Sequence, residues 1–307
     1  MGKIRIGTRG SPLALAQAEE VKSRLLTAHP DLGETDVTIV VIATTGDRIQ
    51  NKSLRELGGK GLFTKEIEEA LLAGKIDLAV HSMKDVPTEL PTGLRISTFL
   101  PREDPRDGFL STLAGSLEEL PQNATVGSSS LRRVAQIRNT RPDLRVVEFR
   151  GNVNTRMRKL SEGVADATFL ACAGLNRLNM ADRITAPVPV ETMLPAVAQA
   201  VIGCEIRLDD QSTADILAPL HHDETAHCVA AERALLAALD GSCRSPIAGL
   251  ATLAGEHLSL RAQILRVDGS ECLDVTRRGP IIQAADMGRD AGEELLARAG
   301  ASFFPSD

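Results

Sequence analysis

The sequence predicts an α/β fold with two α/β domains, followed by a small C-terminal α+β domain. Three patterns indicate this class. Over the first two-thirds of the chain, short apolar runs rich in β-branched residues alternate with helical segments, as in sheets whose strands are joined by helices. Polar motifs follow several of these runs directly. The last third carries three successive apolar runs and then one helical segment, which favours an α+β unit.

The first domain is expected to comprise residues 1–99 together with 200–219. Ser11 and Pro12 form a favourable N-cap and first-turn pair for its first helix. Residues 201–207 form a further apolar run, which we expect to return to this domain as a strand. The other expected elements are strands at 3–8, 37–43 and 76–81 and helices at 13–26 and 63–72.

The second domain is expected over residues 100–199, and Pro87, Pro91, Pro101 and Pro105 mark the passage into it from the first domain. Its expected elements are strands at 124–126, 144–149 and 167–171, a helix ending near 138 and a helix at 152–160. A polar stretch at 209–215 precedes the third domain, which is expected over residues 220–307. Its expected elements are helices at 224–239 and 284–299 and strands at 248–253, 258–267 and 272–276.

The composition favours a small anionic ligand over a nucleic acid. The 307 residues carry a net charge of −6 and include seven Phe but no Trp or Tyr, so few side chains can stack on bases. Residues 126–160 carry a local charge of +7, which leaves −13 on the rest of the chain. A basic segment within an acidic protein indicates a focused anion site, although any single arginine there is also compatible with a solvated helix face.

The sequence predicts a cytoplasmic protein with no membrane partner. No apolar stretch approaches the roughly 20 residues that span a membrane, and the N-terminus lacks an apolar signal segment. The five cysteines are odd in number and show no CxxC spacing, which is typical of reduced thiols.

Three familiar kinds of site are not supported. The segment Gly58-Gly59-Lys60-Gly61 lacks the spacing of a phosphate-binding loop, and no GxGxxG follows a strand, so a nucleotide cofactor is not expected. His221, His222 and His227 are not spaced as helical metal ligands, which prefer i, i+4. We expect no metal there and interpret these histidines as part of a polar helix start.

Two strand–helix junctions are candidates for binding anions. Ser128, Ser129 and Ser130 precede a helix whose first turn holds Arg132 and Arg133. Backbone amides and the helix dipole favour a carboxylate or phosphate at such a point. The next junction repeats the pattern with Arg150, Gly151 and Asn152, and Arg156 follows one turn later. Several guanidinium groups in one place predict a ligand with many carboxylates.

Two further residues are candidates for covalent or acid–base chemistry. Asp85 follows Lys84 at the end of an apolar strand, where it can act chemically or simply cap a turn before Pro87. Cys243 lies beside Arg244, a neighbour that lowers a thiol pKa, but by local chemistry alone it is also compatible with an ordinary reduced thiol.

Seven motifs, in order, resemble those of the porphobilinogen deaminase (hydroxymethylbilane synthase) family. They lie within residues 5–250, and a C-terminal part of appropriate length follows. The motifs are TRGSPLA (8–14), GGKGLFTKE (58–66), HSMKDVP (81–87), GSSSLRR (127–133), FRGNVNTR (149–156), AGLNRL (173–178) and LPAVAQ (194–199).

The resemblance implies two periplasmic-binding-protein-like α/β domains with the active site between them, and a third domain that presents a cofactor cysteine. It implies a monomeric transferase that joins four porphobilinogen molecules head-to-tail, with loss of ammonia. The growing chain is built on a covalent dipyrromethane, and hydrolysis then releases hydroxymethylbilane. Neither a metal nor a nucleotide takes part in this chemistry.

The resemblance also assigns residues. Cys243 matches the cysteine that holds dipyrromethane through a thioether, and Asp85 matches the catalytic carboxylate. Phe63 matches an aromatic residue beside the pyrrole site. The residues that match carboxylate-binding positions are Arg9, Ser11, Lys84, Ser130, Arg132, Arg133, Arg150, Arg156 and Arg177. Gln17, Asp47, Lys60 and Gln199 match polar positions near the pyrroles.

The sequence departs from the family pattern at three positions. Ala198 and Ala200 stand where glycines are common, and Glu56 stands where some members have Lys. Two other functions compete with this interpretation. A non-catalytic protein binding a carboxylate-rich ligand would use the same residues, and a cysteine hydrolase would need a histidine base near Cys243, where none adjoins in sequence.

Overall fold

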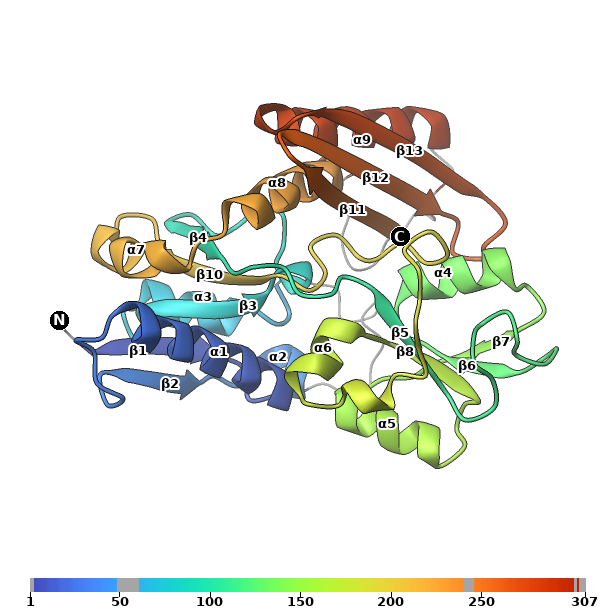
Figure 1. The fold of residues 1–307 in the computed structure, drawn as a ribbon, viewed down its shortest axis with the longest axis horizontal. Coiled ribbons are helices and arrows are strands. Elements are labelled where there is room, and N and C mark those ends of the chain that lie inside the picture. The colour runs from blue at the N-terminus through green and yellow to red at the C-terminus, as the bar shows by residue number, and fades with distance from the viewer. Residues whose placement is uncertain (1–2, 49–60, 240–245, 301–302, 304–307) are drawn as a thin grey trace. The chain divides into compact units, whose positions relative to one another are not determined.

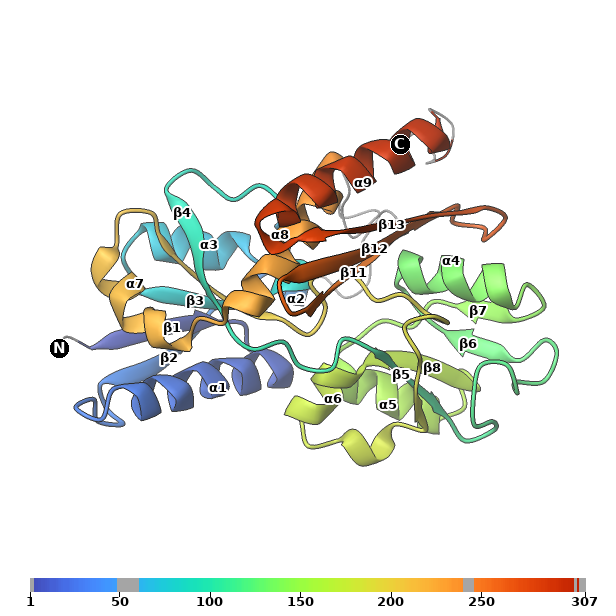
Figure 2. The same cartoon turned by 45° about the horizontal axis from the view of Figure 1, so that its top comes forward.

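The computed structural model describes residues 3–48, 61–239, 246–300 and 303. The chain divides into two compact units, which Figure 1 and Figure 2 show as ribbons. Unit 1 comprises Met1–Glu103 and Ala200–Ala226, and unit 2 comprises Asp104–Gln199 and His227–Asp307.

Unit 1 is built on a five-stranded sheet in the order β2-β1-β3-β10-β4. Its strands are β1 (Ile4–Thr8), β2 (Val37–Val41), β3 (Leu78–Ser82), β4 (Leu94–Phe99) and β10 (Ile202–Arg207). β1 is parallel to β2 and β3, whereas β10 is antiparallel to β3 and β4. The prediction that residues 201–207 return to the first domain as a strand is therefore confirmed.

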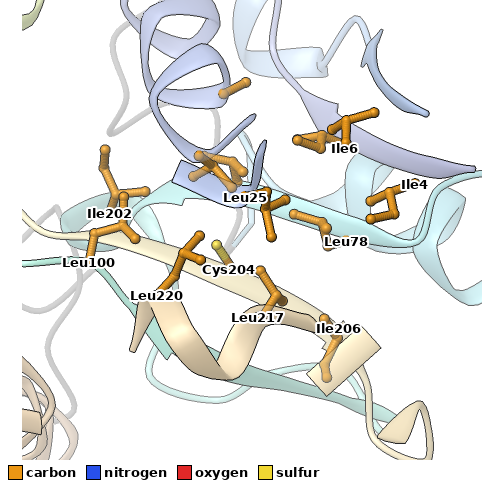
Figure 3. Close-up of a cluster of buried hydrophobic side chains, with 14 of the residues drawn as sticks. Ile4, Ile6, Leu25, Leu78, Leu100, Ile202, Cys204, Ile206, Leu217 and Leu220 are labelled. Atoms are coloured by element: carbon orange, nitrogen blue, oxygen red, sulfur yellow. The ribbon is translucent and has the colours of Figure 1, made fainter. Parts of the chain in front are cut away.

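Successive strand residues point to opposite faces of this sheet, and helices cover both faces. On one face, Leu78 and Ile202 pack with Leu25 of α1 (Pro12–Ala28), as the close-up in Figure 3 shows. On the other face, Ala79 packs with Leu71 of α3 (Lys65–Leu72). Each fully buried aliphatic side chain contributes about 1.5–3 kcal/mol, so these two layers hold the carboxyl ends of the strands in place. The other helices of unit 1 are α2 (Thr45–Arg48), α7 (Gln211–Leu217) and the start of α8 (Asp223–Ala238).

Unit 2 contains a second five-stranded sheet, in the order β7-β6-β8-β5-β9. Its strands are β5 (Asp107–Ser111), β6 (Thr125–Gly127), β7 (Arg145–Val147), β8 (Ala167–Ala171) and β9 (Ala186–Pro187). Its helices are α4 (Leu131–Thr140), α5 (Val153–Ser161) and α6 (Cys172–Arg177). In the core, the rings of Phe109 and Phe169 lie 5.4 Å apart at a tilt of 56°, a favoured aromatic geometry.

The C-terminal part of unit 2 is an antiparallel sheet covered by a helix. The strands β11 (Ile247–Ala254), β12 (His257–Leu265) and β13 (Cys272–Pro280) pair in sequence order, and α9 (Ala284–Ala299) packs on β12 and β13. Asn139 of α4 donates a hydrogen bond to the Gly269 carbonyl (2.9 Å), and Arg138 donates one to the Val267 carbonyl (3.1 Å). These contacts join the α+β sheet to α4 within one unit. The predicted fold class, α/β with a C-terminal α+β part, is confirmed.

Some elements differ from the sequence prediction. Both five-stranded sheets are mixed, because β10 and β5 run antiparallel to their neighbours. Two strands were not predicted from the sequence, namely β4, which lies between Pro91 and Pro101, and β5, which directly follows Pro105. The helix α7 occupies the stretch that was expected to be only polar. Of the helices described, none combines the length and hydropathy needed to cross a membrane.

Two alanines adopt the left-handed backbone conformation that favours glycine. Ala198 has φ of +56° and Ala200 has φ of +74°. This conformation costs an L-residue about 1–2 kcal/mol. Both departures from the family pattern noted in the sequence therefore lie where the backbone favours glycine.

We therefore expect Ala200→Gly to stabilise the folded protein by about 0.5–1 kcal/mol, because relief of strain exceeds the added flexibility of the unfolded chain. Ala196→Gly is the matched control, since Ala196 lies in the same segment outside the left-handed region. The control should destabilise by about 0.5–1 kcal/mol. Denaturant unfolding measures both changes. Equal losses in the two variants would contradict the strain at Ala200.

Candidate functional site

In unit 1, the predicted site residues gather where two parallel strands end. Ile6 of β1 lies opposite Leu78 of β3, so both strands leave the sheet at the same edge. Arg9 follows β1 at this edge, and the turn Met83–Asp85 follows β3. The register therefore brings together two motifs that lie more than seventy residues apart in sequence.

The turn that carries Lys84 and Asp85 is anchored by its buried first residue. Met83 donates its N–H to the Val201 carbonyl (2.9 Å), and its own carbonyl accepts the Val86 N–H (3.2 Å). The Met83 sulfur lies over Gly203, where an added Cβ would approach it to 2.2 Å. The sequence thus places a short 3-10 turn directly on the sheet and leaves Lys84 and Asp85 partly exposed.

The strand before this turn is held on both faces. On the α1 face, the buried side chain of Gln17 donates to Ser82 Oγ (2.8 Å). On the α3 face, His81 Nε2 lies 2.9 Å from Glu205 Oε2, and both side chains are buried. These two contacts hold the end of β3 from both faces of the sheet, which limits the positions that Asp85 can take.

Arg9 and Phe63 form the other half of this edge. The Arg9 guanidinium stacks 4.2 Å from the centroid of the Phe63 ring, a cation–π contact. Gly46 lets the ring approach the backbone, because an added Cβ would lie 2.3 Å from a ring carbon. Ser11 is the N-cap of α1, and its Oγ accepts the Ala14 N–H (3.3 Å). Its hydroxyl therefore orders the helix that follows Arg9.

In unit 2, the two predicted anion motifs also lie at one sheet edge. β6 is parallel to β7 and β8, and the motifs follow the ends of β6 and β7. Ser130 caps α4, and Ser129 Oγ accepts the Phe149 N–H (2.9 Å), which ties one junction to the other. Ser128 is buried and donates its N–H to the Val147 carbonyl (2.9 Å). Asn152 caps α5 by accepting the Thr155 N–H (2.9 Å).

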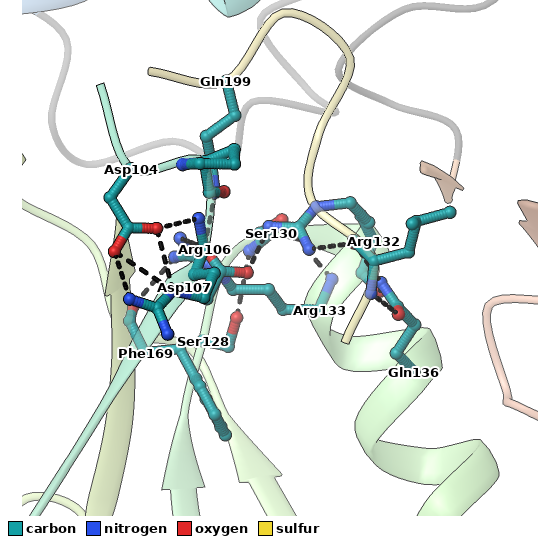
Figure 4. Close-up of polar contacts among 12 residues, drawn as sticks. Asp104, Arg106, Asp107, Ser128, Ser130, Arg132, Arg133, Gln136, Phe169 and Gln199 are labelled. Carbon is teal, nitrogen blue, oxygen red and sulfur yellow. Dashed lines mark hydrogen bonds and ion pairs between the residues drawn. The ribbon is translucent and has the colours of Figure 1, made fainter. Parts of the chain in front are cut away.

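Three predicted site residues converge on a carboxylate that the sequence prediction missed. Figure 4 shows Asp107, the first residue of β5, between Arg132, Arg133 and Gln199. Arg132 Nη2 donates to Asp107 Oδ2 (2.7 Å), and Arg133 Nη2 donates to Asp107 Oδ1 (2.7 Å). Gln199 Nε2 donates to the same Oδ1 (2.9 Å). Asp107 and Gln199 are fully buried, and the two arginines are nearly so.

The charges of this cluster are strongly coupled. Burial opposes the ionisation of Asp107, but the neighbouring guanidinium groups outweigh it and hold the pKa of that carboxyl far below its usual range. Burial lowers the pKa of Arg132, and the Asp107 charge counteracts this shift. Two guanidinium groups face one carboxylate, so the net charge of these three side chains is +1. An anionic ligand group at this place would complete the balance.

The segment that carries Gln199 is anchored by a second buried carboxylate. Glu232 of α8 accepts the Ala198 N–H (2.6 Å) on one oxygen and the Ala251 N–H of β11 (2.7 Å) on the other. Ala198 is one of the two alanines in the left-handed conformation. The strained backbone is thus held by a charge-assisted hydrogen bond next to a residue that binds Asp107.

The remaining predicted residues are placed individually. Arg156 Nε donates to the Gly151 carbonyl (2.9 Å), and Arg177 ends α6. Arg150 is mostly buried, and its Nη1 has no hydrogen-bond partner among the residues described. A buried N–H of this kind favours an acceptor such as a carboxylate. Asp47 lies in α2, whereas Lys60, Glu56 and Cys243 lie outside the described residues.

One of the histidines near the start of α8 stabilises the beginning of that helix. His222 Nδ1 accepts the Thr225 N–H (3.2 Å), so this side chain orders the first turn of the helix. Within the described part of the chain, no three His, Cys, Asp or Glu side chains form a group that could hold a metal ion.

Comparison with known proteins gives consistent matches along the chain. The family model described as "Porphobilinogen deaminase, dipyromethane cofactor binding domain" matches residues 4–215, and "Porphobilinogen deaminase, C-terminal domain" matches residues 226–297. The chain is 59% identical over 301 residues to porphobilinogen deaminase of Paracoccus denitrificans (strain Pd 1222), which covers 98% of this chain and 96% of that protein. It is 53% identical over 307 residues to the chloroplastic porphobilinogen deaminase of Oryza sativa subsp. japonica, covering 99% and 86%.

Solved structures that resemble the chain include periplasmic binding proteins. An ABC transporter substrate-binding protein from Coxiella burnetii aligns with a TM-score of 0.43 and 15% identity, over 73% of this chain and 94% of that one. The methionine-binding protein MetQ aligns with a TM-score of 0.45 and 13% identity, over 73% and 92%.

The geometry at Gly151 yields a prediction for the second anion motif. Gly151 has φ of +122°, and an added Cβ would lie 2.5 Å from Thr155 Cγ2. We expect Gly151→Ala to destabilise the protein by about 3 kcal/mol, because backbone strain and a steric clash add. Gly163→Ala is the matched control. Gly151 precedes α5 and Gly163 follows it; Gly163 has φ of +73° and nothing lies within 4 Å of the added Cβ. It should cost only about 1 kcal/mol in thermal unfolding, and equal costs would refute the clash.

Proposed function

This chain belongs to the porphobilinogen deaminase family, and from this premise we propose that Cys243 holds its dipyrromethane and that Asp85 is its catalytic carboxylate. The chain is a transferase that condenses four porphobilinogen molecules head-to-tail, with loss of ammonia, and releases hydroxymethylbilane by hydrolysis. The observation that carries the residue assignment is the placement of the matching motifs at the carboxyl ends of β1, β3, β6 and β7.

The other four cysteines support Cys243 as the attachment point. Cys172, Cys204 and Cys228 are buried, and Cys272 is half-buried. Burial raises the pKa of Cys204 to about 12 and also raises the pKa of Cys272, so both thiols resist forming the nucleophilic thiolate. Cys243 lies next to Arg244, and a neighbouring guanidinium favours the thiolate.

The residues present fit a covalent group that carries several carboxylates. Bound dipyrromethane supplies the terminal pyrrole carbon to which the next unit is added. Arg150 has a buried N–H group without a hydrogen-bond acceptor among the residues described. The Arg132–Asp107–Arg133 cluster carries an excess positive charge. The capped N-termini of α4 and α5 add backbone N–H groups. We assign carboxylate binding to these groups, to Arg9, Ser11, Lys84, Arg156 and Arg177, and polar contacts to Gln17, Asp47, Lys60 and Gln199.

The role of Asp85 follows from the charge that develops during condensation. Loss of ammonia and attack by a pyrrole carbon place positive charge on pyrrole nitrogens, and a fixed carboxylate stabilises that charge. The turn that bears Asp85 is held by Met83 on the sheet, so the carboxylate needs little reorganisation as the charge forms. Partial exposure leaves it accessible to a ligand. Phe63, stacked on Arg9, offers a flat apolar surface beside this edge.

We also propose that the chain acts as a monomer in the cytoplasm, without nucleic-acid or membrane partners, and that its C-terminal residues 220–307 behave as a third domain. The net charge of −6 and the lack of Trp and Tyr support the absence of nucleic-acid binding. The separate α+β sheet supports the third domain.

We expect the intact mass of the purified wild type to exceed the chain mass by two linked pyrrole units, when the host makes porphobilinogen. Cys243→Ser should lack this adduct and should lack activity, because the thioether cannot form. Cys272→Ser is the matched control and should keep the adduct. An unmodified, inactive wild type would overturn the assignment, and an adduct retained by Cys243→Ser would move it to another residue.

We expect Asp85→Asn to keep the adduct but to lower kcat about 100-fold or more, because the amide cannot stabilise positive charge on pyrrole nitrogens. Glu89→Gln is the control, since Glu89 is an exposed carboxylate four residues further along the same segment. It should leave kcat unchanged. Near-normal turnover in Asp85→Asn would refute the catalytic role.

A further inference from the structure

The cluster around Asp107 fixes two arginines through several contacts each. Besides its bond to Asp107, Arg132 donates from Nη1 to the Leu194 carbonyl (2.7 Å), and Arg133 donates from Nη1 to the Phe169 carbonyl (2.8 Å). Each guanidinium plane is thus defined by one bond to the shared carboxylate and one bond to main chain. The Nε–H groups of both arginines are buried and have no hydrogen-bond partner among the residues described.

Asp107 is suited to hold the two arginines because its own backbone and side chain are fixed. It begins β5, and its N–H and C=O lie in the register that pairs β5 with β8, where Asp107 faces Ala171. Its side chain is fully buried and accepts three hydrogen bonds from two segments, two from the first turn of α4 and one from Gln199. Gln199 also donates to the Pro105 carbonyl (2.8 Å), two residues before Asp107.

Removing a carboxylate from between two buried guanidinium groups leaves like charges close together without compensation. The arginines would then turn towards other acceptors or towards water. Since two of the four Nη atoms bind Asp107, the orientation of both planes would be lost together.

We propose that Asp107 is a positioning residue that orients Arg132 and Arg133 for binding the carboxylates of the pyrrole chain. This inference rests on the proposed role of the two arginines, which Asp107 serves without touching the ligand. It predicts that Asp107 variants impair ligand binding more than the chemical step at Asp85, which lies in the other unit.

Asp107→Glu tests position separately from charge. The added methylene keeps the negative charge but moves the carboxylate by about 1.5 Å, so it cannot keep both 2.7 Å contacts. We expect a folded protein in which the adduct-bearing fraction, measured by intact mass, falls. In the adduct-bearing protein that remains, KM for porphobilinogen should rise about tenfold or more while kcat changes less.

Asp107→Asn removes the charge as well, and should lower the adduct-bearing fraction further. Asp143→Asn is the matched control. Asp143 pairs with Arg141 through two bonds of 2.7 and 2.8 Å at the other end of α4, and it is partly exposed. This control should keep the adduct, KM and kcat at wild-type values. Circular dichroism and thermal unfolding show whether each variant folds. If Asp107→Asn does not fold, the adduct content and KM of Asp107→Glu test the proposal.

Arg132→Leu and Arg133→Leu distinguish the inference from the function on which it rests. Loss of adduct or a raised KM in both arginine variants, together with the same defects in Asp107→Glu, supports the proposal. Defects in the arginine variants with a wild-type KM and adduct content in Asp107→Glu would overturn the positioning role alone. Wild-type behaviour of the arginine variants would overturn the proposed role of the arginines and this inference with it.

Discussion

The buried carboxylate of Asp107 is the constraint on which the proposed anion-binding side of unit 2 depends. Arg132 and Arg133 lie in the first turn of α4, where a solvated arginine would be free to sample many rotamers. Their bonds to Asp107 and to main-chain carbonyls leave each guanidinium one orientation. The cost of burying two cations is thereby reduced, and the cluster keeps one excess positive charge.

The same device recurs where the backbone is strained. Glu232 accepts two backbone N–H groups and so connects α8, β11 and the segment that carries Gln199. Surface ion pairs such as Arg141–Asp143 contribute little by comparison, because water screens them. A few buried carboxylates with complete hydrogen bonding therefore determine the local geometry, while the many exposed pairs do not.

Unit 1 reaches the same end by packing instead of charge. The turn of Asp85 is held by the buried Met83 over Gly203, and β3 is flanked by Gln17 and His81 contacts. This leaves the Asp85 carboxylate partly exposed, as its proposed role requires, whereas the Asp107 carboxylate is buried. Three of the other cysteines are buried and Cys272 is half-buried, which supports the proposed role of Cys243.

The sequence by itself determined the fold class and most strands and helices, because these depend on local periodicity and capping. The motifs that carry Asp85 and the arginines were recognised by their resemblance to a known family. The sequence could not reveal Asp107, whose partners lie 25, 26 and 92 residues away. Nor did it reveal the antiparallel β5 and β10, since strand direction depends on which distant segments pair. Arg132 and Arg133 were assigned from the sequence to the carboxylates of a ligand, and no internal partner was named for them. Only the tertiary structure decided that half of their terminal nitrogens bind an internal carboxylate, because burial of two charges requires a partner that no local pattern records.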